Sequence, residues 1–290
     1  MNQPVYVIAF GQSDIGLIRT NNEDSFLLAD LTRDVFTTAP SALNHVVGEK
    51  GSLFIVADGM GGAKAGEVAS RMAVEMVPQK LSEQLKKLEF LNRQAFVTAL
   101  KKSIEHANLA IYQESHRNEE RRGMGTTLTA AGVYDGAIFF AQVGDSRGYL
   151  VRNSSIVQMT QDQSLVADLV ASGALSPEEA KKHPKRNVIL QALGVQSDVD
   201  VVLSFDELKR GDWLILCSDG LSGKLEAEEM RDVLKKCSEP QEACRQMITM
   251  ARERGGEDNI TAVVAKFEGE RLSLPSPEEA PTYQHLNLDK

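Results

Sequence analysis

Apolar residues recur along the chain in short runs that end in polar or glycine-rich sequence, a pattern typical of β-strands that lead into loops. Three such runs fall near the N-terminus, at 5–10, 25–29 and 53–57. Two helical stretches follow, and we expect both to cover one face of a sheet. The first lies near 66–77, where Pro78 is expected to end it, and the second keeps helical spacing of apolar residues from Phe96 to Ile111.

The pattern returns to strands between 127 and 159, where the dipeptides Asp135-Gly136 and Asn153-Ser154 predict tight antiparallel hairpins. Ser176 precedes a proline and two glutamates, which together predict the start of a short helix. The remaining elements are predicted as strand, strand, helix, helix and strand, at 199–205, 213–218, 227–236, 241–254 and 260–267. This order predicts an α+β architecture with mostly antiparallel sheet.

Two segments lack this periodicity. Residues 30–52 lie between two predicted strands and are expected to form an irregular, inserted surface loop. Residues 271–290 contain three prolines and few large apolar side chains, so we expect a poorly ordered C-terminal tail.

Composition narrows the class of protein. The 290 residues are 42% hydrophobic and 25% charged, as in a folded globular chain, and the formal charge of −9 argues against nucleic acid as a partner. The longest apolar runs are far shorter than the roughly 20 residues that cross a bilayer, so no membrane span is expected. The first ten residues lack the basic and apolar regions of a secretory signal, which predicts a cytoplasmic protein.

Acidic residues cluster beside four of the predicted strands. An isolated aspartate at such a place usually forms a turn or faces solvent, but several anions converging on one site would need cations. Two of the clusters directly follow strongly apolar strands, so their carboxylates should lie at the lip of a buried sheet. The four clusters are Asn22-Glu23-Asp24, Asp58-Gly59-Met60-Gly61-Gly62, Ser218-Asp219-Gly220 and Glu257-Asp258-Asn259.

Oxygen ligands of this kind suit Mg²⁺ or Mn²⁺, which retain several waters and accept carboxylates and backbone carbonyls. Two such ions can clamp a phosphate and activate water for in-line attack, without a covalent intermediate. Arg19 could supply a fork of donors that matches two phosphate oxygens. His183 is followed by Pro184 and is more simply explained as a structural residue.

Seven motifs between about Gly11 and Phe267 resemble the type 2C metal-dependent serine/threonine protein phosphatases in their bacterial form. The motifs occur in the order typical of that family. They are Arg19-Thr-Asn-Asn-Glu-Asp24, Val56-Ala-Asp-Gly-Met-Gly-Gly62, Gly125-Thr-Thr127, Val143-Gly-Asp-Ser-Arg147, Asn187 to Gly194, Cys217-Ser-Asp-Gly-Leu221 and Asp258-Asn-Ile-Thr261.

The resemblance implies one catalytic domain over residues 1–270, built from two packed antiparallel sheets flanked by helix pairs. It implies hydrolysis of phosphoserine and phosphothreonine in proteins by water or hydroxide bridging two Mn²⁺ or Mg²⁺ ions. The substrates would be phosphoproteins, and a cognate serine/threonine kinase is an expected partner.

The resemblance also implies a role for individual residues. Asp58 would bridge both metals, and the Gly59 carbonyl, Asp219 and Asp258 would complete their shells. Glu23 and Asp24 would hold metal-bound waters, Arg19 would bind the phosphate, and Asp145 would help to bind a third, weaker metal. Residues 165–185 would form a flap over the site that tunes substrate choice.

Two positions depart from the family pattern. Met60 stands where eukaryotic members often have a histidine proposed as general acid, so water or another group must protonate the leaving serine. Gln163 stands where bacterial members commonly have histidine.

Two other functions are compatible with parts of the sequence. Gly144-Asp145-Ser146-Arg147-Gly148 fits the Gly-x-Ser-x-Gly pattern of serine hydrolases, with His183 downstream as a possible base. Ser146, however, leads into a predicted strand, whereas a nucleophile elbow leads into a helix. The second alternative is a phosphatase-shaped binding protein whose metal site has decayed. The presence of every motif carboxylate argues against it.

Overall fold

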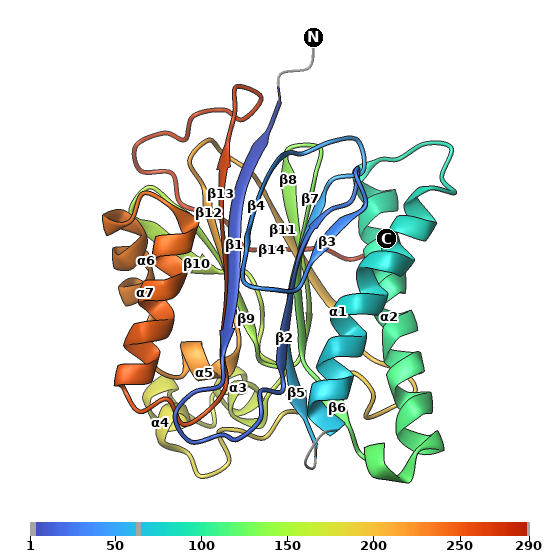
Figure 1. The fold of residues 1–290 in the computed structure, drawn as a ribbon. Coiled ribbons are helices and arrows are strands. Elements are labelled where there is room, and N and C mark those ends of the chain that lie inside the picture. Colours follow the sequence, from blue (N-terminus) through green and yellow to red (C-terminus); the bar gives the residue numbers. More distant parts are fainter. Residues whose placement is uncertain (1–3, 62–64, 289–290) are drawn as a thin grey trace.

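The computed structural model describes residues 4–61 and 65–288. Two antiparallel sheets are stacked face to face, and a pair of helices covers the outer side of each sheet (Figure 1). The predicted α+β fold with two packed antiparallel sheets flanked by helix pairs is therefore confirmed.

All strand pairs are antiparallel. The first sheet has the order β10 (Ser155–Gln158), β9 (Arg147–Arg152), β12 (Trp213–Cys217), β13 (Ile260–Glu268), β1 (Tyr6–Asp14) and β4 (Ala42–Val46). The second has the order β14 (Gln284–His285), β11 (Val202–Glu207), β8 (Ala137–Val143), β7 (Leu128–Tyr134), β5 (Ser52–Met60), β2 (Asp24–Asp30) and β3 (Val35–Thr37), with β6 (Gly125–Thr126) paired to the end of β5.

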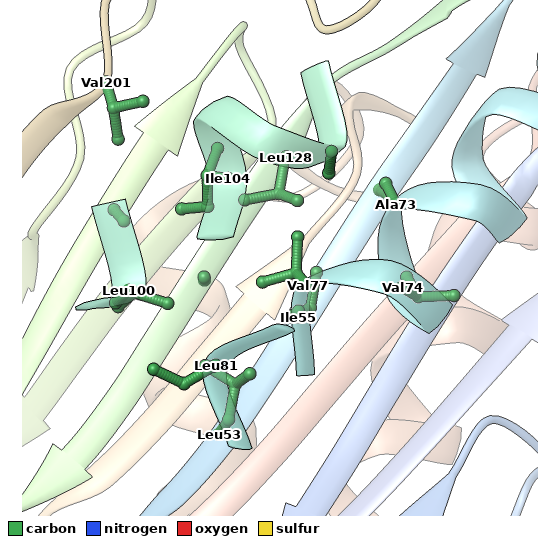
Figure 2. Packing of buried hydrophobic residues seen from close by; sticks show 14 of the residues in the cluster. Leu53, Ile55, Ala73, Val74, Val77, Leu81, Leu100, Ile104, Leu128 and Val201 are labelled. Carbon is green, nitrogen blue, oxygen red and sulfur yellow. The ribbon is translucent and has the colours of Figure 1, made fainter. Parts of the chain in front are cut away.

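The helices and sheets enclose three apolar layers. Helices α1 (Ala65–Leu85) and α2 (Arg93–Arg117) cover the second sheet, and α6 (Ala227–Lys236) and α7 (Pro240–Glu253) cover the first. Figure 2 shows the layer under α1 and α2, where Leu53 and Ile55 of β5 lie against Val77 and Leu81 of α1. Large side chains such as Phe54 and Phe267 fill the layer between the sheets.

Helix α1 continues past Pro78, contrary to the expected end there. Proline in a helix interior removes one backbone hydrogen bond and costs about 3 kcal/mol. Val77, Leu81 and Leu85 are buried in the apolar layer between the helices and the sheet, and Pro78 is buried as well. This burial offsets the cost. The helix therefore ends at Leu85.

Residues 30–52 are more regular than an irregular loop. Val35–Thr37 pairs with β2 as strand β3, and Ala42–Val46 pairs with β1 as strand β4. The segment thus crosses from the edge of one sheet to the edge of the other, and its strands satisfy backbone groups that β1 and β2 would otherwise leave unpaired.

The C-terminal tail also differs from the sequence expectation, because residues 271–288 lie against the body of the protein. Leu272 is 2% exposed, and β14 adds two residues to the free edge of β11. The buried Arg152 guanidinium donates to the carbonyl of Ala280, and the Thr282 amide donates to Asp206. These few contacts order a segment whose composition predicted disorder.

The predicted turns are confirmed. Asp135 and Gly136 both have positive φ, 50° and 75°, and they connect β7 to β8 as a two-residue turn. Asn153, with φ 55°, occupies the corresponding turn between β9 and β10. Ser176 forms a complete capping box with Glu179 at the start of α4 (Pro177–Lys182), which follows α3 (Leu165–Ala171).

Candidate active site

The acidic clusters meet at one end of the two sheets. Asp24 and Asp58 are directly opposite each other in the β2–β5 ladder. Asp219 begins the short helix α5 (Asp219–Ser222) after β12, and Asp258 precedes β13, the neighbour of β12. The antiparallel register brings Asp219 and Asp258 to adjacent strand ends. Hydrogen bonds from Ser218 and Thr261 to Asp24 join this pair to Asp24 and Asp58, so the acidic clusters converge.

Burial and mutual repulsion disfavour the ionised form of these carboxylates. The pKa of Asp58 is raised well above its usual range by burial and then by the neighbouring charges of Asp24, Asp219, Asp145 and Asp258. Burial also raises the pKa of Asp219, and the Asp258 charge adds to the effect, whereas a hydrogen bond with Asp58 opposes it. A bound cation would relieve this repulsion.

Asp24 is held by two hydroxyl groups that the sequence analysis did not identify as functional. The Oγ of Ser218 and the Oγ1 of Thr261 donate to its Oδ2 at 2.7 and 2.6 Å. Burial nevertheless raises the pKa of Asp24 to about 7. Its other oxygen, Oδ1, is buried without a hydrogen-bond partner among the described residues, which fits an acceptor for a water or another donor in the site.

Gly59 allows three segments to meet beside Asp58. A Cβ at Gly59 would lie 2.2 Å from the carbonyl oxygen of Gly66 and 2.5 Å from that of Glu23. The Gly59 amide donates to the same Glu23 carbonyl at 3.1 Å. Only glycine fits where α1 and the residue before β2 approach β5 so closely. The glycine-rich cluster of the sequence extends to Gly62, which lies outside the described residues.

Asn259 fixes the loop between β1 and β2, a role that the sequence analysis also missed. Its Oδ1 accepts from the Glu23 amide at 2.8 Å, and its Nδ2 donates to the carbonyls of Ile15 and Asn21, both at 3.0 Å. The side chain thereby ties residues on both sides of Arg19 to the segment before β13 that contains Asp258. The sequence signal that could have identified this role is the position of Asn259 directly after the motif residue Asp258.

Arg19 lies at the exposed rim of this group. Its Nη2 donates to Asp258 Oδ2 at 2.8 Å, and 53% of its side chain is exposed. The hydrogen bond and charge of Asp258 raise the pKa of Arg19, so the guanidinium stays cationic. Glu23 lies nearby, half-buried, and burial raises its pKa. The structure thus places an exposed cation beside the acidic site.

Asp145 joins the cluster from the turn between β8 and β9. Burial raises its pKa to about 7, and the Asp219 charge contributes. The next residue, Ser146, is completely buried, and its Oγ shares a 2.7 Å hydrogen bond with Thr127 Oγ1. Thr127 in turn accepts from the Asp58 amide and donates its own amide to the Asp58 carbonyl.

These contacts exclude Ser146 as the nucleophile of a serine hydrolase. The chain continues from Ser146 into strand β9 instead of a helix. His183 ends α4, where its Nδ1 accepts from the Lys185 amide at 3.2 Å. Ser146 therefore supports the backbone around Asp58 and Asp145.

Gln163, at the position where the resemblance implies a histidine, holds the Asp145 turn in place. Its Oε1 accepts from the Gly144 amide at 2.7 Å, and its own amide donates to the Gly144 carbonyl at 2.9 Å. Its Nε2 donates to the carbonyl of Asp200. The neutral amide of Gln163 therefore positions the backbone next to Asp145 without gaining or losing a proton.

The chemistry of this donor set fits hydrated divalent cations. Within the described residues, no three Asp, Glu, His or Cys side chains form a ready-made cage of ligands. Mg²⁺ and its analogues keep several waters and need only one or two carboxylates each, so a full protein cage is not required. Converging carboxyl groups with raised pKa and the orphaned oxygen of Asp24 both suit such ions.

Comparison with known proteins is consistent with this geometry. The profile of the family described as "Protein phosphatase 2C" matches residues 41–260. The serine/threonine phosphatase stp of Listeria welshimeri is 38% identical over 240 residues, which cover 80% of this chain and 94% of the relative.

Solved structures show the same fold. The serine/threonine phosphatase PstP/Ppp of Mycobacterium tuberculosis superposes with a TM-score of 0.75 at 35% identity, covering 90% of this chain and 99% of that one. The catalytic domain of PstP in complex with two manganese ions has a TM-score of 0.72 at 33% identity, covering 91% and 99%.

Proposed function

Because this chain belongs to the protein phosphatase 2C family and is a metal-dependent serine/threonine protein phosphatase, we propose that it uses a two-metal mechanism at the Asp58 site. The observation that carries the proposal is the convergence of Asp24, Asp58, Asp219 and Asp258, whose mutual repulsion calls for cations. Two Mn²⁺ or Mg²⁺ ions, when bound, would activate water and neutralise the phosphate charge.

Different residues would bind the cations and the substrate. Asp58, the Gly59 carbonyl, Asp219 and Asp258 would be the metal ligands. Asp145 would serve a third, weaker ion, which fits its burial beside Asp219.

Glu23 and Asp24 would accept hydrogen bonds from waters in the site, and Ser218 and Thr261 would orient Asp24 by their bonds to Oδ2. Because these bonds hold Oδ2 in place, the other carboxylate oxygen of Asp24, Oδ1, can accept a proton or a hydrogen bond. Met60 offers no general acid, so the leaving serine or threonine oxygen would take its proton from water.

Arg19 would orient the phosphate. Its guanidinium is exposed, cationic and close to the carboxylates, so a phosphoester entering the site would contact it with two oxygens. Asp258 aligns the side chain through one hydrogen bond, which leaves further N–H groups free for substrate.

A first test is hydrolysis of a phosphothreonine peptide with Mn²⁺, with EDTA, and by the variants Asp58→Asn and Asp219→Asn. We expect release of phosphate that needs the metal and falls by more than about 100-fold in both variants. Asp232→Asn, on the exposed face of α6, is the matched control and should keep full activity.

Activity that survives EDTA and both substitutions would refute the two-metal mechanism. A wild-type protein that binds Mn²⁺ but hydrolyses no phosphopeptide would instead support the alternative of a binding protein.

The physiological substrates are proposed to be phosphoserine and phosphothreonine proteins, including a cognate serine/threonine kinase. We also propose a cytoplasmic location; the described helices include none that is long and apolar enough to span a membrane. Comparison of the phosphoproteomes of a deletion strain and its parent tests the kinase link, which is refuted if no phosphoserine or phosphothreonine site on a kinase rises.

A further inference from the structure

A strongly basic run stands beside the proposed catalytic end of this acidic protein. The sequence Lys181-Lys-His-Pro-Lys-Arg186 contains three lysines, one arginine and no acidic residue, although the whole chain has 41 acidic and 32 basic residues. All four cationic side chains belong to exposed residues. The run covers the end of α4 and the turn that follows it.

Only one of the four cations is paired with a carboxylate in the described structure. Lys181 pairs with Glu226 at 2.9 Å and with Glu178 at 3.7 Å. In the part of the chain that the structure describes, Lys182, Lys185 and Arg186 form no ion pair. Glu179 in the same segment is engaged in the capping box with Ser176. The unpaired charge therefore faces solvent.

The run is attached to the site by its flanking backbone. The carbonyl of Val188, two residues after Arg186, accepts from the Leu165 amide, and the amide of Leu190 donates to the Gln163 carbonyl. Gln163 clamps Gly144, next to Asp145. Farther along, Leu193 and Thr126 exchange two backbone hydrogen bonds.

Thr126 pairs with Gly59, so the other end of the segment is tied to the backbone beside Asp58. Figure 1 shows α3, α4 and α5 at the same end of the sheets as the end of β5. The basic run and the backbone beside Asp58 thus lie at the same end of the molecule.

We propose that Lys182, Lys185 and Arg186 bind a carboxylate-rich stretch of the substrate polypeptide, on one side of the phosphoresidue that is hydrolysed. This inference rests on the proposed function and adds a substrate class to it. Complementary charge raises the encounter rate and favours one partner over another, and this effect falls with ionic strength. Arg186 would also suit bidentate pairing with a carboxylate.

The test compares phosphothreonine peptides with neutral flanks, with glutamates on the N-terminal side, and with glutamates on the C-terminal side. We expect the full-length enzyme with Mn²⁺ to have a kcat/KM about ten-fold higher for one acidic peptide than for the neutral one. The preference should lie mainly in KM and should shrink when ionic strength is raised from about 0.02 M to about 0.3 M.

The triple variant Lys182→Gln/Lys185→Gln/Arg186→Gln should lose this preference and keep its kcat for the neutral peptide. The matched control Lys87→Gln/Lys102→Gln/Lys236→Gln removes the same charge from exposed positions elsewhere and should keep the preference.

Equal kcat/KM for acidic and neutral peptides in the wild type overturns the inference, as does an equal loss in both triple variants. Binding to phosphatidylserine vesicles that is lost only in the 182/185/186 variant, with unchanged peptide selectivity, overturns it in favour of a membrane surface. Failure of the wild type on every peptide would refute the proposed function itself, whereas hydrolysis of all peptides without preference would refute only this inference.

Discussion

At the scale of single residues, the site combines burial with negative charge, and its carboxyl groups therefore respond to both protons and cations. Burial raises the pKa of Asp24 and of Asp145 to about 7. A carboxyl group whose pKa is raised on folding binds more protons in the folded chain than in the unfolded chain. Its favourable contribution to stability is complete below the unfolded pKa near 4 and is lost as pH rises toward 7.

The raised pKa values of these carboxyl groups predict how Mn²⁺ changes thermal stability at different pH. At pH 8 the carboxylates are ionised and repel one another, so added Mn²⁺ should raise the melting temperature by about 5 °C over EDTA. At pH 5 protons compete with the metal, and the gain should be much smaller. Thermal melts with Mn²⁺ and with EDTA at the two pH values measure it, and an equal gain at both would contradict the prediction.

At the scale of secondary-structure elements, local turn chemistry sets the register of the hairpin that carries β7 and β8. The turn residues Asp135 and Gly136 both adopt left-handed backbone conformations. Asp tolerates this region, and glycine has no steric cost there. The turn lies at the end of β7 opposite Thr127, which contacts Asp58.

Replacing the turn glycine should therefore lower stability without affecting catalysis. Gly136→Val should decrease the free energy of unfolding by about 1–2 kcal/mol, because a side chain at φ 75° is strained. Urea denaturation and phosphopeptide hydrolysis measure the two effects. A comparable loss of kcat in the folded variant would show that the hairpin is coupled to the site.

At the scale of the whole molecule, the C-terminal segment acts as part of the fold. It runs past the buried ion cluster of Arg152, Asp206 and Asp212, and Glu279 of the segment joins that cluster at 3.5 Å from Arg152. Strand β14 then covers the edge of β11, and Leu286 donates its amide to the Leu203 carbonyl. An uncovered edge strand would be open to pairing with other chains.

Two leucines in this segment provide a matched test of its packing. Leu272 is 2% exposed, whereas Leu274 is 70% exposed. Leu272→Ala should reduce the free energy of unfolding by about 2–4 kcal/mol through loss of burial and a residual cavity, and Leu274→Ala by less than about 0.5 kcal/mol. Equal, negligible effects in chemical denaturation would indicate a disordered tail.

The sequence by itself determined those features that depend on neighbours in the chain. The periodicity of apolar residues located most strands and helices, and Asp135-Gly136 and the Ser176 capping box marked their ends, because backbone propensity and capping are local. The same patterns placed Asp58 and Asp219 at strand ends.

Only the tertiary structure decided the features that depend on packing between distant segments. Thr261 and Ser218 bond Asp24 across 237 and 194 residues, and no local pattern specifies such a contact. Helix α1 continues past Pro78 because its residues are buried against the assembled sheet. The tail is ordered because β14 pairs with the edge of β11, which also exists only in the assembled sheet. Burial and long-range hydrogen bonding are properties of the packed chain, so they override local propensity where the two disagree.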